Sequence, residues 1–176
     1  MELKAILDKA WEYRRLGNYQ KCRDLLNQVH SSCQENDHIV LGRLYHVYMQ
    51  IEWDHHRYNK ALKFCKKALQ HYSKSENLNL KAHSRRHLAD LQRQLGMLGE
   101  SEANYCQVLE IYGTSPSKVG DLANALRGYG LLLERLDRPL EAQQVWLKIK
   151  EIYQMHHISE GVQEAIEALK RLAHHN

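Results

Sequence analysis

The chain has 176 residues, a length suited to one domain, and its 25 basic and 21 acidic residues give a net charge of +4. That small surplus does not by itself indicate a nucleic-acid partner. No run approaches the roughly 18 apolar residues that a membrane span needs, and the N-terminus lacks the basic-then-apolar order of a signal peptide, so we expect a cytoplasmic protein with no membrane partner. The four cysteines have no CxxC spacing, and we expect reduced packing residues.

Four short turns divide the chain into similar segments. Gly17, His56, Gly96 and Asp137 occupy equivalent positions in these turns, and the steps between them are 39, 40 and 41 residues. A fixed period in this range is typical of stacked repeats, in which each unit buries its apolar face against its neighbours.

The residues after each turn repeat at helical spacing. Four positions after each turn form columns of similar residues. The fifth position holds Cys22, Ala61, Ser101 and Ala142, and the ninth holds Leu26, Cys65, Tyr105 and Trp146. The twelfth holds Val29, Ala68, Val108 and Ile149, and the sixteenth holds Cys33, Tyr72, Tyr112 and Tyr153. These small, large and medium apolar columns predict a buried face on the second helix of each pair. The tyrosine column indicates that this helix extends about a turn beyond the standard repeat of roughly 34 residues.

The pattern predicts four antiparallel helix pairs, at about residues 3–36, 40–75, 79–114 and 118–157, and no sheet. Pro116 after Ser115, and Pro139 after the fourth turn, fit helix starts. An apolar stripe predicts a last helix at 159–174 with Ser159 as its N-cap. Its polar outer face suits a cap on the open end of the stack. The alternative is an amphipathic helix that docks on a partner or a membrane surface.

Two segments carry a resemblance to a known family. Residues 108–112 (VLEIY) and 123–130 (ANALRGYG) resemble the second-helix end and the first-helix start of tetratricopeptide repeats. The long period is more similar to the kinesin-light-chain and Pins/LGN repeats, or to bacterial peptide-receptor repeats. The resemblance implies one all-α domain over residues 1–176, a right-handed superhelix of four helix pairs plus a capping helix, acting as an adaptor or scaffold. Lys9 and Arg85 depart from the family at first-helix positions that are usually apolar.

The resemblance also implies that the first helices line a concave groove that binds a partner protein or peptide. The candidate groove residues are Lys4, Trp11, Arg43, His46, Gln50, His83, Arg86, His87, Asp90, Arg93, Asn124 and Arg127. The columns thirteen and ten residues before each turn hold no acidic residue, which favours an acidic peptide or a C-terminal carboxylate as ligand.

In this hypothesis Arg43, Arg86 and Arg127 are the charge anchors and the groove histidines are secondary donors. Binding should then strengthen as the pH falls through the histidine range near 6.5. The alternative is that these are solvated basic residues on a helical surface.

Other functions are less favoured. The chain has no GxxxxGK[ST], HExxH or GxSxG sequence, so we expect no catalytic residue and no cofactor. His83, His87 and Asp90 share one helix face and could present two imidazoles and a carboxylate to a metal ion, but Arg86 beside them disfavours a cation, and we expect no metal site. An RNA-binding repeat protein or a peptide-sensing regulatory domain is the alternative function. The near-balanced charge and the lack of an aromatic column on the first helices argue against RNA.

Overall fold

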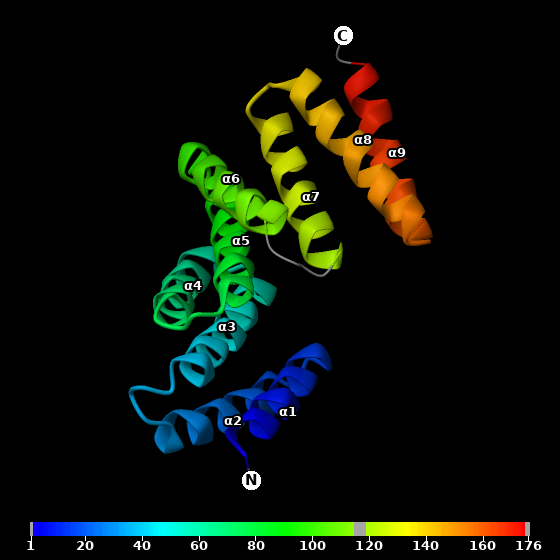
Figure 1. Ribbon diagram of the computed structural model, residues 1–176. Coiled ribbons are helices and arrows are strands. Elements are labelled where there is room, and N and C mark those ends of the chain that lie inside the picture. The colour runs from blue at the N-terminus through cyan, green and yellow to red at the C-terminus, as the bar shows by residue number, and fades with distance from the viewer. Residues whose placement is uncertain (1, 115–118, 175–176) are drawn as a thin grey trace. The chain divides into compact units, whose positions relative to one another are not determined.

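The computed structural model describes residues 2–114 and 119–174, and within these ranges the protein contains nine helices and no strand (Figure 1). The helices are α1 (Leu3–Arg15), α2 (Tyr19–Ser32), α3 (His38–Asp54), α4 (Tyr58–Ser73), α5 (Leu78–Gln94), α6 (Leu98–Thr114), α7 (Val119–Arg135), α8 (Pro139–Met155) and α9 (Ser159–Ala173). The all-α class expected from the sequence is confirmed. The helix start expected at Ser115 and Pro116 lies outside the described residues. None of the described helices has the length and apolarity that crossing a bilayer requires.

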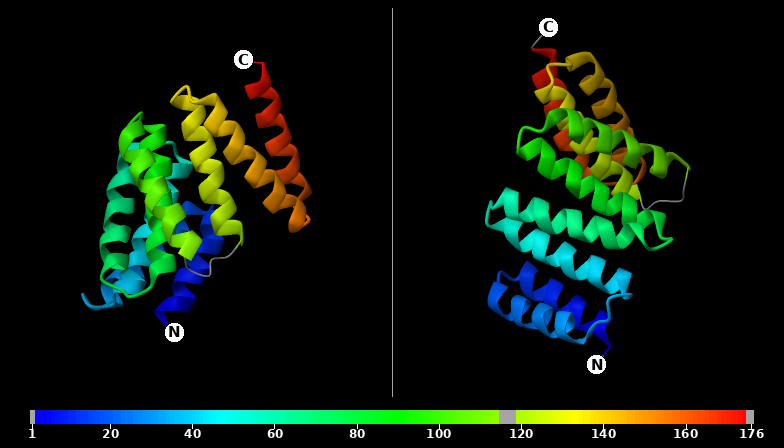
Figure 2. Two further views of the ribbon diagram at one scale, coloured as in Figure 1. Left: turned by 45° about the horizontal axis from the view of Figure 1, so that its top comes forward. Right: turned by 90° about the vertical axis from the view of Figure 1, so that its left-hand side faces the viewer.

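The chain forms two compact units, Met1–Leu95 with α1 to α5 and Gly96–Asn176 with α6 to α9. In the first unit, α1 with α2 and α3 with α4 are successive antiparallel pairs, and α5 packs on α4 (Figure 2). In the second unit, α6 packs on α7, α7 on α8, and α8 on α9. Consecutive elements are thus spatial neighbours within each unit, as in a stacked helical array.

The turns that define the repeat share one backbone conformation. Gly17 and Gly96 have φ values of +72° and +78°, and the non-glycine residues His56 and Asp137 at the equivalent positions both have φ values of 56°. In three of these turns the next residue donates its N–H to the carbonyl five positions back, from Asn18 to Tyr13, Arg57 to Glu52 and Arg138 to Leu133. This is the helix-ending motif that requires a left-handed residue, so the structure confirms the register inferred from the sequence.

The second-helix columns form the core as expected, except at Cys33, which is half-buried just after the end of α2. All four residues in each of the columns five, nine and twelve after the turns are 0 % exposed. Tyr72, Tyr112 and Tyr153 of the last column are also buried. Two of these rings lie over glycines: a Cβ added at Gly42 would lie 2.5 Å from the ring of Tyr72, and one at Gly161 would lie 2.5 Å from that of Tyr153. Glycine at these positions lets the ring contact the neighbouring helix backbone directly.

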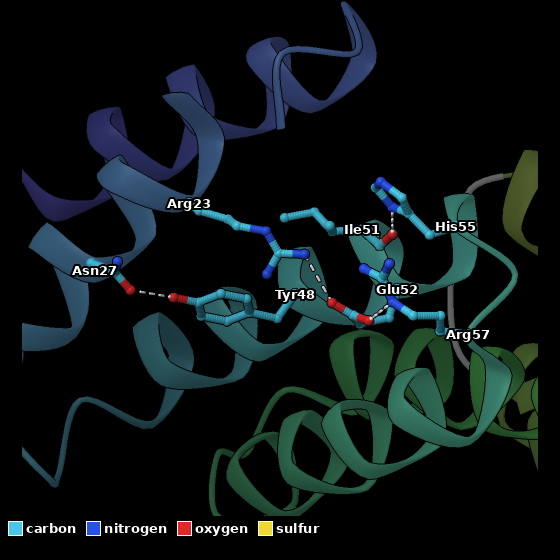
Figure 3. Close-up of polar contacts among 7 residues, drawn as sticks. All are labelled: Arg23, Asn27, Tyr48, Ile51, Glu52, His55 and Arg57. Atoms are coloured by element: carbon cyan, nitrogen blue, oxygen red, sulfur yellow. Dashed lines mark hydrogen bonds and ion pairs between the residues drawn. The ribbon is translucent and has the colours of Figure 1, made fainter. Parts of the chain in front are cut away.

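Polar contacts join α2 to α3 in the first unit (Figure 3). The carboxylate of Glu52 accepts hydrogen bonds from Arg23 at 2.9 Å and from Arg57 at 2.5 Å. Nearby, the Tyr48 hydroxyl donates to Asn27 at 2.8 Å. The contacts of Arg23 with Glu52 and of Tyr48 with Asn27 connect one helix pair to the next, and the repeat columns gave no indication of them.

The last helix packs on α8 through Gly161, Ala165, Ala168 and Leu172, which are buried. Its N-cap is Ile158, whose side chain makes no capping hydrogen bond, and Ser159 is the first helical residue. The sequence-based assignment of Ser159 as N-cap is therefore wrong by one position. The reason is that α8 ends in the same motif as the other turns. His157 has a left-handed backbone conformation, and Ile158 donates its N–H back to the carbonyl of Tyr153 at 2.9 Å.

Candidate functional site

The first unit carries a cleft of about 520 Å³ between α1, α3, α4 and α5. It is lined by Trp11, Ile39, Arg43, His46, Val47, Gln50, Tyr72, Leu80, His83, Arg86 and His87. The lining residues of α3 lie three, four and seven positions after Arg43, and those of α5 three and four positions after His83, so each helix presents one face to the cleft. Seven of the twelve residues expected to form a groove line this cleft.

The other five candidates are distributed differently. Lys4 is exposed at the start of α1, while Arg93 is half-buried on α5. Asp90 is buried on α5 and pairs with Arg86. Asn124 and Arg127 lie on α7, in the second unit. The structure therefore gathers seven of the candidates, all from α1, α3 and α5, in one cleft of the first unit.

A row of rings joins the helices that line the cleft. Trp11 of α1 stacks on His46 of α3, with ring centroids 6.1 Å apart and an interplanar angle of 29°. His46 in turn contacts His83 and His87 of α5, at centroid distances of 5.2 and 4.8 Å. The guanidinium of Arg14 lies over Trp11 at 4.8 Å. These contacts join the three first helices of the unit through side chains rather than through backbone.

Each arginine proposed as a charge anchor already has a carboxylate partner. Arg43 donates to Asp8 of α1. Arg86 donates to Asp90 one turn later, at 2.6 Å, and on the second unit Arg127 contacts Glu164 of α9 at 2.5 Å. The positive charge of each of these arginines is therefore partly neutralised by a carboxylate of the protein itself. Sequence columns could not show the pairs of Arg43 and Arg127, because their acids lie on other helices. Asp90, one turn after Arg86, was itself among the candidates.

Two of the groove histidines do not act as cations near neutral pH. Burial lowers the pKa of His46 well below its ordinary value, and the nearby His83 and Arg86 lower it further. Burial also lowers the pKa of His87, with Arg86 as the next cause. The expectation that these two side chains gain charge near pH 6.5 is wrong. Both rings are neutral in the range where they would meet a ligand, and neutral imidazole is the form that coordinates metals.

Four apolar or aromatic residues of the cleft were not among the candidates. Ile39, Val47 and Leu80 share helix faces with chosen positions, and Ile39 lies one turn before Arg43. Tyr72 was recognised only as a packing residue of the second-helix column. Helical spacing around Arg43 and His83, followed one turn in each direction, could have identified Ile39, Val47 and Leu80.

The tetratricopeptide repeat family profile matches residues 48–113, which span the end of α3 to the end of α6. Over these residues the chain is similar to tetratricopeptide repeat proteins. No curated protein sequence matches it. Tetratricopeptide repeats generally mediate interactions between proteins.

Solved structures share the fold over most of the chain. BtubC (BKLC) from P. vanneervenii has a TM-score of 0.64 at 17% identity, covering 93% of this chain and 76% of that one. Nearly identical TPR-like repeats of a putative kinesin light chain from Podosopora anserina also have a TM-score of 0.64, at 16% identity, covering 97% of this chain and 94% of that one. A single-substitution variant of these repeats matches at the same TM-score and identity, covering 98% of this chain and 96% of that one. At these identities the likeness concerns the fold alone.

Proposed function

We propose that this protein binds an acidic peptide segment of a partner protein in the cleft between α1, α3 and α5. The observation that carries the proposal is the lining of the cleft, where apolar and aromatic side chains surround two arginines. Such a combination suits a peptide that buries apolar side chains and presents carboxylates. On this proposal the protein is a cytoplasmic adaptor or scaffold and its activity is binding.

The apolar part of the lining supplies the contact surface. Ile39 is 53% exposed in the first turn of α3, although large apolar side chains of this protein are mostly buried. Leu80 and Trp11 are partly exposed beside it. An exposed isoleucine at the edge of a cleft gains free energy when a ligand covers it, at about 25 cal/mol per Å².

The arginines supply the charge preference in spite of their internal partners. Asp8, the partner of Arg43, is 55% exposed, so the pair is screened by water and contributes little to stability. A ligand carboxylate can therefore share or replace Asp8 on the guanidinium of Arg43. Arg86 is held more firmly, because it and Asp90 are both 12% exposed. Arg43 is for this reason the anchor that a ligand reaches first.

The test is a binding measurement with an immobilised random peptide pool rich in Asp and Glu, beside a pool with Asn and Gln in their place and a single-stranded RNA. We expect retention on the acidic pool, falling as salt rises. Arg43→Gln should weaken this binding by about tenfold, the loss of one hydrogen bond to a charged group. Arg15→Gln is the matched control, since Arg15 is exposed on α1 outside this cleft.

Three results would contradict the proposal. Equal retention on the acidic and amide pools would remove the charge preference. Equal loss in Arg43→Gln and Arg15→Gln would show an effect of net charge rather than of the cleft. Retention on the RNA with none on the acidic peptides would favour the RNA-binding alternative instead.

A further inference from the structure

The three histidines of the cleft carry an inference beyond peptide binding. We propose that His46, His83 and His87 form a binding site for a divalent transition metal ion, with Zn²⁺ as the best match. This ligand set differs from the one that the sequence suggested, because His46 of α3 takes the place of Asp90. The exchange follows from the fold: Asp90 is held by Arg86, while His46 reaches the two α5 histidines across the cleft.

The geometry is close to that of a three-nitrogen site. One ring nitrogen from each of the three histidines lies within 4.8 Å of the other two. Tetrahedral zinc holds nitrogen ligands at about 2.0 to 2.1 Å, which places them roughly 3.4 Å from one another. Small rotations of the three rings would close this difference. His83 and His87 are one turn apart on α5, the spacing that lets two imidazoles on a helix meet one ion.

His46 gives independent support, because part of its ring lacks a partner. Its Nδ1 is buried and makes no hydrogen bond, and the whole residue is only 9% exposed. A buried polar atom without a partner is uncommon and costs about 1 to 3 kcal/mol. If the His46 ring binds a metal ion in this cluster, the imidazole gains a polar interaction that the protein alone does not provide.

Arg86 is the main opposing feature. Its Nη2 lies 2.8 Å from Nε2 of His87, and its Nη1 lies 2.6 Å from Asp90. The guanidinium therefore competes with a metal for one His87 nitrogen and repels a cation, while Asp90 offsets part of its charge. We infer that the site is weakened, but not blocked, by Arg86. Three protein nitrogens leave a tetrahedral ion one position for water or a ligand.

The experiment uses the full chain freed of metal with a chelator. Zn²⁺ binding is measured by calorimetry, and Co²⁺ binding by its visible absorption, which is strong only for tetrahedral coordination. We expect one equivalent bound at micromolar affinity or tighter. His83→Gln should weaken binding by at least about tenfold. Arg86→Gln should tighten it by about tenfold, because a competing cation is removed.

A matched control separates this site from exposed histidines elsewhere. The double variant His156→Gln and His157→Gln removes two exposed imidazoles of the second unit, and it should bind the ion as the unchanged chain does. The proposal is overturned if the unchanged chain binds neither ion at micromolar concentrations. It is also overturned if His83→Gln, shown to be folded by circular dichroism, retains full affinity, or if the control variant abolishes binding.

Discussion

Arg23 of α2 and Glu52 of α3 form an ion pair between two successive helix pairs, with Nη2 and Oε1 2.9 Å apart. The side chain of Glu52 is only 5% exposed. Hydrogen bonds from Arg57 and then from Arg23 lower the pKa of this carboxyl from 4.5 to about 2, against the opposing effect of burial. A buried carboxylate with two arginine partners thus holds adjacent repeats together, and its charge state should matter for stability.

The first prediction is a loss of stability in acid through Glu52. Its pKa is lower in the folded than in the unfolded chain, so its contribution is complete above about pH 4.5 and is lost as the pH falls toward about 2. The contribution is at most about 3 kcal/mol. Urea unfolding of Glu52→Gln should therefore show lower stability than the unchanged chain at about pH 6 and a smaller difference at about pH 3. Glu76→Gln, an exposed control, should follow the unchanged chain at both values.

How far the sequence predicts this molecule depends on the kind of contact. The turn positions Gly17, His56, Gly96 and Asp137 were found because every repeat needs a left-handed residue there, which constrains residue type locally. The buried second-helix columns were found for the same reason, since packing repeats with the period. Pairings that occur once do not repeat, and a column comparison cannot detect them.

In the candidate site, some features could be predicted from the sequence and others could not. The family resemblance implied that His46, His83 and Arg86 face one groove, and the structure places them in one cleft. It could not show that Asp8 reaches Arg43 from α1, since this contact depends on how two helices cross. Nor could it show the neutral state of His46, which follows from burial by three helices rather than from its position on one.

The second prediction concerns the contact of Tyr72 with Gly42. A methyl group at Gly42 would lie 2.5 Å from Cε1 of the buried Tyr72 ring, so Gly42→Ala must move the ring or the helices. We expect a loss of about 1 to 3 kcal/mol in unfolding free energy. Gly99→Ala is the control, because nothing lies within 4 Å of its added methyl group, and it should be neutral or slightly stabilising. A Gly42→Ala protein as stable as Gly99→Ala would contradict this packing.

The third prediction separates backbone strain from crowding at Gly17. No atom lies within 4 Å of a Cβ added there, yet its φ is +72°. Gly17→Ala should therefore destabilise the first unit by about 1 kcal/mol through conformation alone. Gly17→Asn should cost less, because asparagine tolerates the left-handed region. Thermal unfolding of the two variants measures the difference, and equal loss in both would point to a cause other than φ.

The fourth prediction concerns α9 as the cover of α8. Tyr153 lies over Gly161, and Ala165, Ala168 and Leu172 complete the packed face with Ile149 and Ile152. Arg127 also reaches Glu164 from α7. A chain ending at residue 158 would expose this apolar face of α8, so we expect self-association and a lower unfolding temperature.

Light scattering and thermal unfolding measure both effects. A chain ending at residue 173 serves as the control, because it keeps all of α9 and should behave as the unchanged chain does. A finer variant is Gly161→Leu, whose side chain would enter the Tyr153 ring and should separate α9 from α8 without removing it. If the chain ending at 158 stays monomeric and equally stable, α9 does not serve as a cap, and the hypothesis of a docking helix is favoured.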